Sequence, residues 1–253
     1  MPTDEEGRFS MADRSAFPTT HATFLETLLV TLPEGNPREP SQRGSTGDEA
    51  AETARRHVME RYAEPLEVFV KGSSLARLGE PKELVNGFLA SRLSDAEYLR
   101  AWPRSGMRFR RWLMNGMLFY GQGIARDRAR AQARGSNTPV DTLDTRAGSV
   151  AAAEEHFERA WALAVVREAT ARVEAELAHE GRSDDFDIFR RHAIDGQPYA
   201  VFAAEVGRTA QQCAGATRLV AQRVRARLTE VLREEGVPEA ELDDEIARVR
   251  GVL

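Results

Sequence analysis

Residues 199–220 read YAVFAAEVGRTAQQCAGATRLV, and they carry the clearest fold signal in the chain. Apolar side chains recur at helical spacing on both sides of Gly207, and glycine favours a turn there because it adopts a positive φ without steric cost. Thr209 and Gln212 have the spacing of a capping box, the pattern that begins a helix. The stretch therefore predicts a helix-turn-helix, with Cys213 as a small buried residue of its core.

The second helix of this pattern has polar residues near its start. Gln211, Gln212, Gly215 and Arg218 are predicted to face outward. In a helix-turn-helix this part of the recognition helix meets base edges in the major groove, where glutamine pairs with adenine and arginine with guanine. Segment 208–228 contains five arginines and no acidic residue, a net charge of +5.

The rest of the chain also shows helical rather than alternating hydrophobic spacing. Four segments repeat apolar residues every three or four positions: 58–69, 80–93, 109–134 and 151–179. Ser94 and Glu97 have the spacing of another capping box. Stretches rich in glycine and proline, at 33–48 and 135–150, interrupt the helical pattern.

The predicted fold class is therefore all-α, with two small helical domains joined by a flexible linker. The predicted boundaries are a partly disordered N-terminal extension over 1–47, a first domain over 48–134, a linker over 135–153 and a second domain over 154–253.

The composition excludes several classes of protein. The 253 residues include 35 Lys and Arg against 40 Asp and Glu, a net charge of −5, so the chain is not basic throughout. A single cysteine forms no internal disulfide and no cysteine-rich zinc framework. The chain has no run of about eighteen apolar residues, and its acidic start is unlike a secretion signal. We expect a cytoplasmic protein that does not bind a membrane.

A second basic segment lies over 108–134, where seven arginines and one aspartate give a net charge of +6. Four aromatic residues are interleaved with these arginines: Phe109, Trp112, Phe119 and Tyr120. This combination suits unpaired nucleic acid, because arginine holds phosphate while a base stacks on a ring. The alternative is that both basic segments are solvated helix faces and that the aromatic side chains belong to the core. At this spacing we expect at least half of the four to be buried.

The order of these features resembles that of the extracytoplasmic-function sigma factors of bacterial RNA polymerase. Residues 80–89, EPKELVNGFL, are similar to the polymerase-binding motif of that family, and Phe-Pro-Thr-Thr at 17–20 is similar to the opening of one subgroup. Further similar segments are 62–70 (the first core helix), 109–113 and 127–132 (the promoter-melting region), 154–253 (region 4) and 242–246 (an acidic tail). The resemblance covers residues 17–253.

The resemblance implies a non-catalytic subunit, without cofactor or metal, that binds core RNA polymerase and directs promoter recognition and transcription initiation. Glu80, Glu83 and Asn86 would bind the polymerase. The residues implied for the melted −10 element are Arg110, Arg111, Trp112, Asn115, Phe119, Tyr120, Arg126, Arg128 and Arg130. Those implied for the double-stranded −35 element are Arg208, Gln211, Gln212, Gly215, Arg218 and Gln222. An anti-sigma or other regulatory protein is a further implied partner.

Two alternatives from other classes stay open. One is a stand-alone helix-turn-helix regulator that binds duplex DNA as a dimer, without polymerase. The other is a metal-dependent helical hydrolase that uses the carboxylates beside His179, although a solvated loop that caps the next helix is the more common role of such a cluster. The carboxylates are Glu180, Asp184, Asp185 and Asp187. The sequence contains no phosphate-binding loop or nucleophile elbow, so no catalytic constellation is expected.

Overall fold

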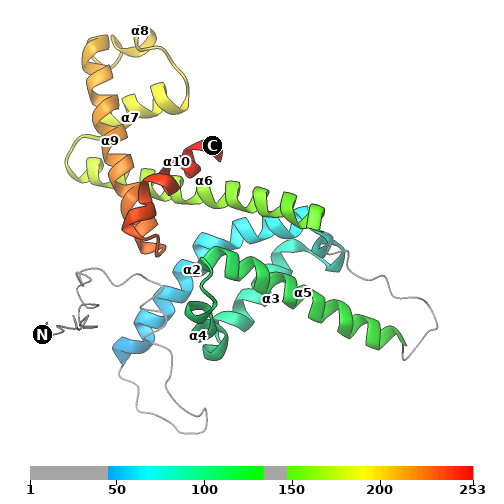
Figure 1. The fold of residues 1–253 in the computed structure, drawn as a ribbon. Helices are drawn as coiled ribbons and strands as arrows, with labels where there is room; N and C mark the ends of the chain where they lie inside the picture. Colours follow the sequence, from blue (N-terminus) through cyan, green and yellow to red (C-terminus); the bar gives the residue numbers. More distant parts are fainter. Residues whose placement is uncertain (1–44, 134–146, 253) are drawn as a thin grey trace, which may run out of the picture.

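The computed structural model describes residues 45–133 and 147–252, and these ranges consist of helices and short connections (Figure 1). No strand occurs in either range, which confirms the predicted all-α class. The Phe-Pro-Thr-Thr segment at 17–20, the rest of the N-terminal extension up to residue 44, and residues 134–146 of the predicted linker lie outside the described residues.

Residues 45–133 form four α-helices and one short 3-10 helix. They are α2 (Ser45–Gly72), η1 (Ser74–Leu78), α3 (Pro81–Leu93), α4 (Ala96–Ser105) and α5 (Phe109–Ala133). Helix α4 begins one residue later than its predicted capping box requires, because its N-cap is Asp95 rather than Ser94. The Asp95 carboxylate accepts a hydrogen bond of 3.1 Å from the backbone N–H of Tyr98.

The second half contains the predicted helix-turn-helix. Its elements are α6 (Ala147–His179), α7 (Ser183–Phe189), the π-helical turn η2 (Arg190–Ile194), α8 (Tyr199–Phe202), α9 (Ala210–Glu234), η3 (Glu239–Glu241) and α10 (Leu242–Val252). Gly207 makes the turn between α8 and α9 with a φ of +65°. Thr209 and Gln212 form the predicted capping box. Cys213 is buried against Phe202, as predicted for the core of the motif.

One hydrophobic core joins the two halves of the chain. It contains residues of α2, α3 and α5 together with residues of α6, the end of α9 and α10. Helices α2 and α6 run side by side (Figure 1), with Phe69 packed edge-on against Phe157 at a ring-centre distance of 6.4 Å. The predicted separation into two domains is not confirmed, because α6 begins within the predicted linker and packs against the first half.

Arg61 is the centre of a polar network among α2, α6 and α9. Its guanidinium forms ion pairs with Glu168 and Glu235 and lies 3.0 Å from the Nε2 atom of His57. The Tyr62 hydroxyl donates to Glu235, and burial raises the pKa of Tyr62 well above its usual value, so the hydroxyl keeps its proton. Arg61 is 3% exposed and Glu235 is 8% exposed, so each buried charge depends on the other.

Gly116 permits a close approach between α5 and the rings of α3 and α4. A Cβ atom at Gly116 would lie 2.1 Å from the Tyr98 hydroxyl oxygen and 3.1 Å from Cζ of Phe88. We expect Gly116→Ala to lower the free energy of unfolding by about 1–3 kcal/mol, because the added methyl group overpacks the core.

The matched control is Gly123→Ala in the same helix, where a Cβ atom would meet nothing within 4 Å. Alanine there should raise the free energy of unfolding by about 0.5–1 kcal/mol, since it restricts the unfolded chain. Chemical denaturation of both variants checks the difference. Equal effects would contradict the close approach at Gly116.

His57 faces Arg61 on its own helix, Glu168 and Arg172 on α6, and Glu234 on α9. Burial and the charge of Arg61 lower the pKa of its imidazole below the usual 6.5. As the pH falls, the His57 imidazole is therefore protonated at a higher pH in the unfolded chain than in the folded chain. The free energy of unfolding consequently falls as the pH drops below about 6.5. Between about pH 7.5 and about pH 5.5 we expect wild type to lose more stability than His57→Gln, which does not titrate there. Denaturant titrations at both pH values test this, and parallel losses would count against it.

Candidate nucleic-acid interface

One exposed face of α5 carries several of the residues predicted to bind a single strand. Its members recur every three or four positions, so their side chains share a side of the helix: Arg111, Asn115, Phe119, Gln122, Arg126 and Arg130. We call these six residues the α5 face. Phe119 is 66% exposed, the most exposed large apolar side chain in the described ranges. An exposed ring flanked by arginines suits base stacking combined with phosphate binding.

A groove of about 530 Å³ runs beside the α5 face where α5 meets the beginning of α6. Its lining is Met107, Arg111, Asn115, Leu118, Phe119, Gln122, Val150, Ala151 and Glu154. Gln122 and Glu154 were not among the residues predicted to bind a nucleic acid. Helical spacing from Asn115 and Phe119 would have found Gln122. No local signal points to Glu154, because only the packing of α6 against α5 brings it to the groove.

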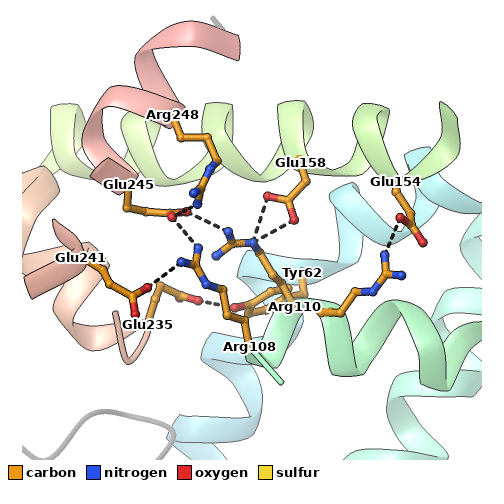
Figure 2. Close-up of polar contacts among 10 residues, drawn as sticks. Tyr62, Arg108, Arg110, Glu154, Glu158, Glu235, Glu241, Glu245 and Arg248 are labelled. Carbon is orange, nitrogen blue, oxygen red and sulfur yellow. Dashed lines mark hydrogen bonds and ion pairs between the residues drawn. The ribbon is translucent and has the colours of Figure 1, made fainter. Parts of the chain in front are cut away.

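Arg110 lies in the junction between the two halves rather than on the α5 face (Figure 2). It is 6% exposed, its Nε donates to both carboxylate oxygens of Glu158 at 2.9 Å, and its Nη2 donates to Glu245 at 2.8 Å. Its guanidinium also lies 4.2 Å from the ring centre of Trp161. Arg110 therefore has a structural role in this arrangement and does not reach the surface as a DNA contact would require.

Three of the four aromatic residues of this segment face the core. Phe109 is buried, Trp112 packs against Tyr98 at a ring-centre distance of 5.3 Å, and Tyr120 packs against Phe88 at 5.8 Å. Trp112 and Tyr120, both predicted −10 contacts, are half-buried. Of the four aromatic side chains one is therefore buried, two are half-buried against the core, and Phe119 is exposed.

The far end of α5 extends away from the rest of the molecule (Figure 1) and carries three of the predicted contacts. Arg126, Arg128 and Arg130 are all exposed there. Arg126 donates to the carbonyl oxygen of Gln122 at 3.2 Å, and Arg130 lies 3.5 Å from a carboxylate oxygen of Asp127. Both of these contacts are exposed, and exposed contacts of this kind contribute little to stability.

Helix α9, the second helix of the helix-turn-helix, presents a second exposed face. Gln211, Gly215, Arg218 and Gln222 are exposed and lie on one side of the helix, as their spacing requires. We call these four residues the α9 face. The other two predicted −35 residues have structural contacts. Gln212 accepts the backbone N–H of Thr209 at 2.8 Å, and Arg208 forms an ion pair with Asp185 of α7.

The residues predicted to bind polymerase lie on α3. Glu80, the N-cap of this helix, Glu83 and Asn86 are all exposed, and their three-residue spacing places them along one side of it. Neither glutamate takes part in an ion pair within residues 45–133 and 147–252. This acidic edge is therefore available to a partner.

The acidic cluster near His179 does not converge on a metal site. Glu180, Asp185 and Asp187 all form ion pairs with arginines, and the hydrogen bond from Arg223 lowers the pKa of Glu180. In the described part of the chain, potential ligand atoms come within 4.8 Å of one another in a different group, His57, Glu168 and Glu234. Arg61 and Arg172 already neutralise both of these carboxylates, so the group does not fit a cation well.

Comparison with protein-family models, with curated proteins and with solved structures gives no match to this chain. Among residues 45–133 and 147–252, no helix combines the length and the apolar character needed to cross a membrane. The features on which a functional argument can rest are therefore the α5 face, the α9 face and the acidic edge of α3.

Proposed function

We propose that this chain is a sigma factor of the extracytoplasmic-function type, which binds core RNA polymerase and directs promoter recognition and transcription initiation. The observation that carries the proposal is the presence of two exposed polar helix faces in one all-α molecule. The α5 face combines three arginines with an exposed aromatic ring, and the α9 face carries Arg218 and two glutamines on the second helix of the helix-turn-helix. A promoter that is being opened offers a single strand to the first and a duplex to the second.

In this proposal the α5 face holds the melted −10 element. The Phe119 ring stacks on an unpaired base, while Arg126 and Arg130 bind the phosphates on either side. Asn115 and Gln122 donate to or accept from base edges, since both amides carry a donor and an acceptor. Duplex DNA hides its base faces within the stack, so a surface of this kind favours the opened strand.

The α9 face reads the −35 element in the major groove. Arg218 pairs with a guanine, and Gln211 and Gln222 are suited to adenine. Gly215 has no side chain and a Cβ atom there would meet nothing within 4 Å, which leaves space for the DNA backbone or a base edge. The ion pair between Arg208 and Asp185 fixes the start of α9 against α7.

The acidic edge of α3 binds the clamp helices of the largest polymerase subunit through Glu80, Glu83 and Asn86. This role needs exposed carboxylates that have no ion pair of their own, and both glutamates meet that condition in the described residues. The proposal includes a cytoplasmic location, the absence of catalytic activity and of a cofactor, and an anti-sigma or other regulatory protein as a further partner.

A stand-alone helix-turn-helix regulator is the second candidate. It is favoured by the ion pairs at the start of α5, where Arg110, Arg111 and the preceding Arg108 are all bound by glutamates. All four residues of the α9 face are by contrast exposed. Binding to polymerase separates the two candidates, because only the sigma factor requires it.

The first test is capture of core RNA polymerase from a bacterial lysate by the tagged full-length protein. We expect stoichiometric capture by wild type and at least a tenfold loss with Glu83→Arg, because the reversed charge repels a basic surface on the partner. Glu174→Arg is the matched control, an exposed glutamate of α6 that undergoes the same charge change. Equal capture by both variants would rule out the acidic edge of α3 as the polymerase-binding site. No capture by wild type, with duplex binding intact, would favour the regulator.

The second test concerns Arg218. If it pairs with a base, Arg218→Ala should cost about 1–3 kcal/mol of binding free energy, confined to one position of the site. Selection from a pool of randomised duplexes by each protein measures this position by position. The control is Arg159→Ala, which removes an exposed arginine of α6. A uniform loss across all sequences would instead identify a phosphate contact.

A further inference from the structure

Glutamates from the second half of the chain hold all three arginines at the start of α5 (Figure 2). Arg108 forms ion pairs with Glu241 of η3 and Glu245 of α10, Arg110 with Glu158 of α6 and Glu245, and Arg111 with Glu154 of α6. A carboxylate offers guanidinium the same paired oxygen acceptors as a phosphate. The glutamates therefore occupy these arginines in the way that a nucleic-acid backbone would.

The three arginines differ in how firmly they are held. The Arg110 side chain is 7% exposed, whereas those of Arg108 and Arg111 are 39% and 47% exposed. Moving Arg110 would leave the carboxylate of Glu245, which is 0% exposed, without one of its partners. Arg108 can exchange Glu241 for a phosphate while it keeps its pair with Glu245, and Arg111 can exchange Glu154, without disturbing the hydrophobic core.

Two of the glutamates are correspondingly accessible. The side chains of Glu154 and Glu241 are 23% and 49% exposed. Glu154 also lines the groove beside Asn115 and Phe119, where a strand stacked on Phe119 would pass. Its negative charge repels a phosphate there and at the same time neutralises Arg111.

We infer that Glu154 and Glu241 are built-in competitors for phosphate, which occupy Arg111 and Arg108 and weaken the binding of single-stranded DNA by the free protein. The inference rests on the proposed role of the α5 face. It goes beyond that role, because it assigns the two glutamates a regulatory contact that limits binding until a strand or a partner displaces them.

The test measures the binding of a fluorescein-labelled single-stranded DNA of about 30 nucleotides and mixed sequence, by anisotropy between about 50 mM and about 200 mM salt. The full-length double variant Glu154→Gln/Glu241→Gln should bind about three- to tenfold more tightly than wild type at the lower salt. Its plot of log affinity against log salt should steepen by about 0.7–1.4, because each arginine released to a phosphate adds about 0.7 on a single strand and Arg108 keeps its pair with Glu245.

The matched control is the double variant Glu155→Gln/Asp244→Asn. It removes the same two negative charges from exposed positions of α6 and α10 that make no ion pair in the described residues. Long-range attraction rises equally in both double variants, so only release of the arginines distinguishes them. Adding Arg111→Gln to Glu154→Gln/Glu241→Gln should make the slope of log affinity against log salt shallower by about 0.7, because one arginine that binds a phosphate is lost.

Equal affinities and slopes for the two double variants would overturn the inference and leave the proposed function intact. If no protein, wild type included, binds the strand even at the lower salt, the proposed role of the α5 face fails and the inference fails with it. Polymerase capture in that case shows whether the rest of the proposed function survives.

Discussion

A guanidinium that is 3% exposed requires counter-charges, and Arg61 of α2 finds them on α6 and α9. Removing a single partner from such a pair leaves an uncompensated buried charge, so the three helices are held in one register. The hydrophobic contact between α2 and α6 continues this junction from Tyr62 to Gly72. The positions of the other elements depend on this junction of α2, α6 and α9. Helix α5 packs on α2 and α3, and α6 and α9 hold the helix-turn-helix at a distance from α5.

Helix α5 shows how partners, rather than residue types, set the role of an arginine. At its first turn Arg110 is buried between Glu158, Glu245 and Trp161 and supports the junction. In the middle, Asn115 and Phe119 border the groove, and at the far end Arg126 and Arg130 extend into solvent. One continuous basic segment thus contributes to the core, to a groove and to a free surface.

Most of the local structure could be predicted from the sequence. In the helix-turn-helix the turn at Gly207, the capping box at Thr209 and the burial of Cys213 are as expected, whereas the first helix is shorter than expected and ends at Phe202. These features depend on side chains within a few positions of one another. The N-cap at Asp95 was missed because Ser94 also fits a capping pattern, and only the backbone conformation decides between the two. The position of Arg110 was missed because its partners lie 48 and 135 residues away.

The sequence by itself determined the helices, their amphipathic faces and the exposed edges of α3 and α9, because the period of apolar residues fixes which side of a helix avoids water. Only the tertiary structure decided that α6 packs against α2 in one shared core and that acidic side chains of the second half face the basic start of α5. The physical reason is the range of the interactions. Periodicity and caps act within one or two turns, whereas the choice among many acidic and basic side chains depends on which helices the burial of apolar surface brings together.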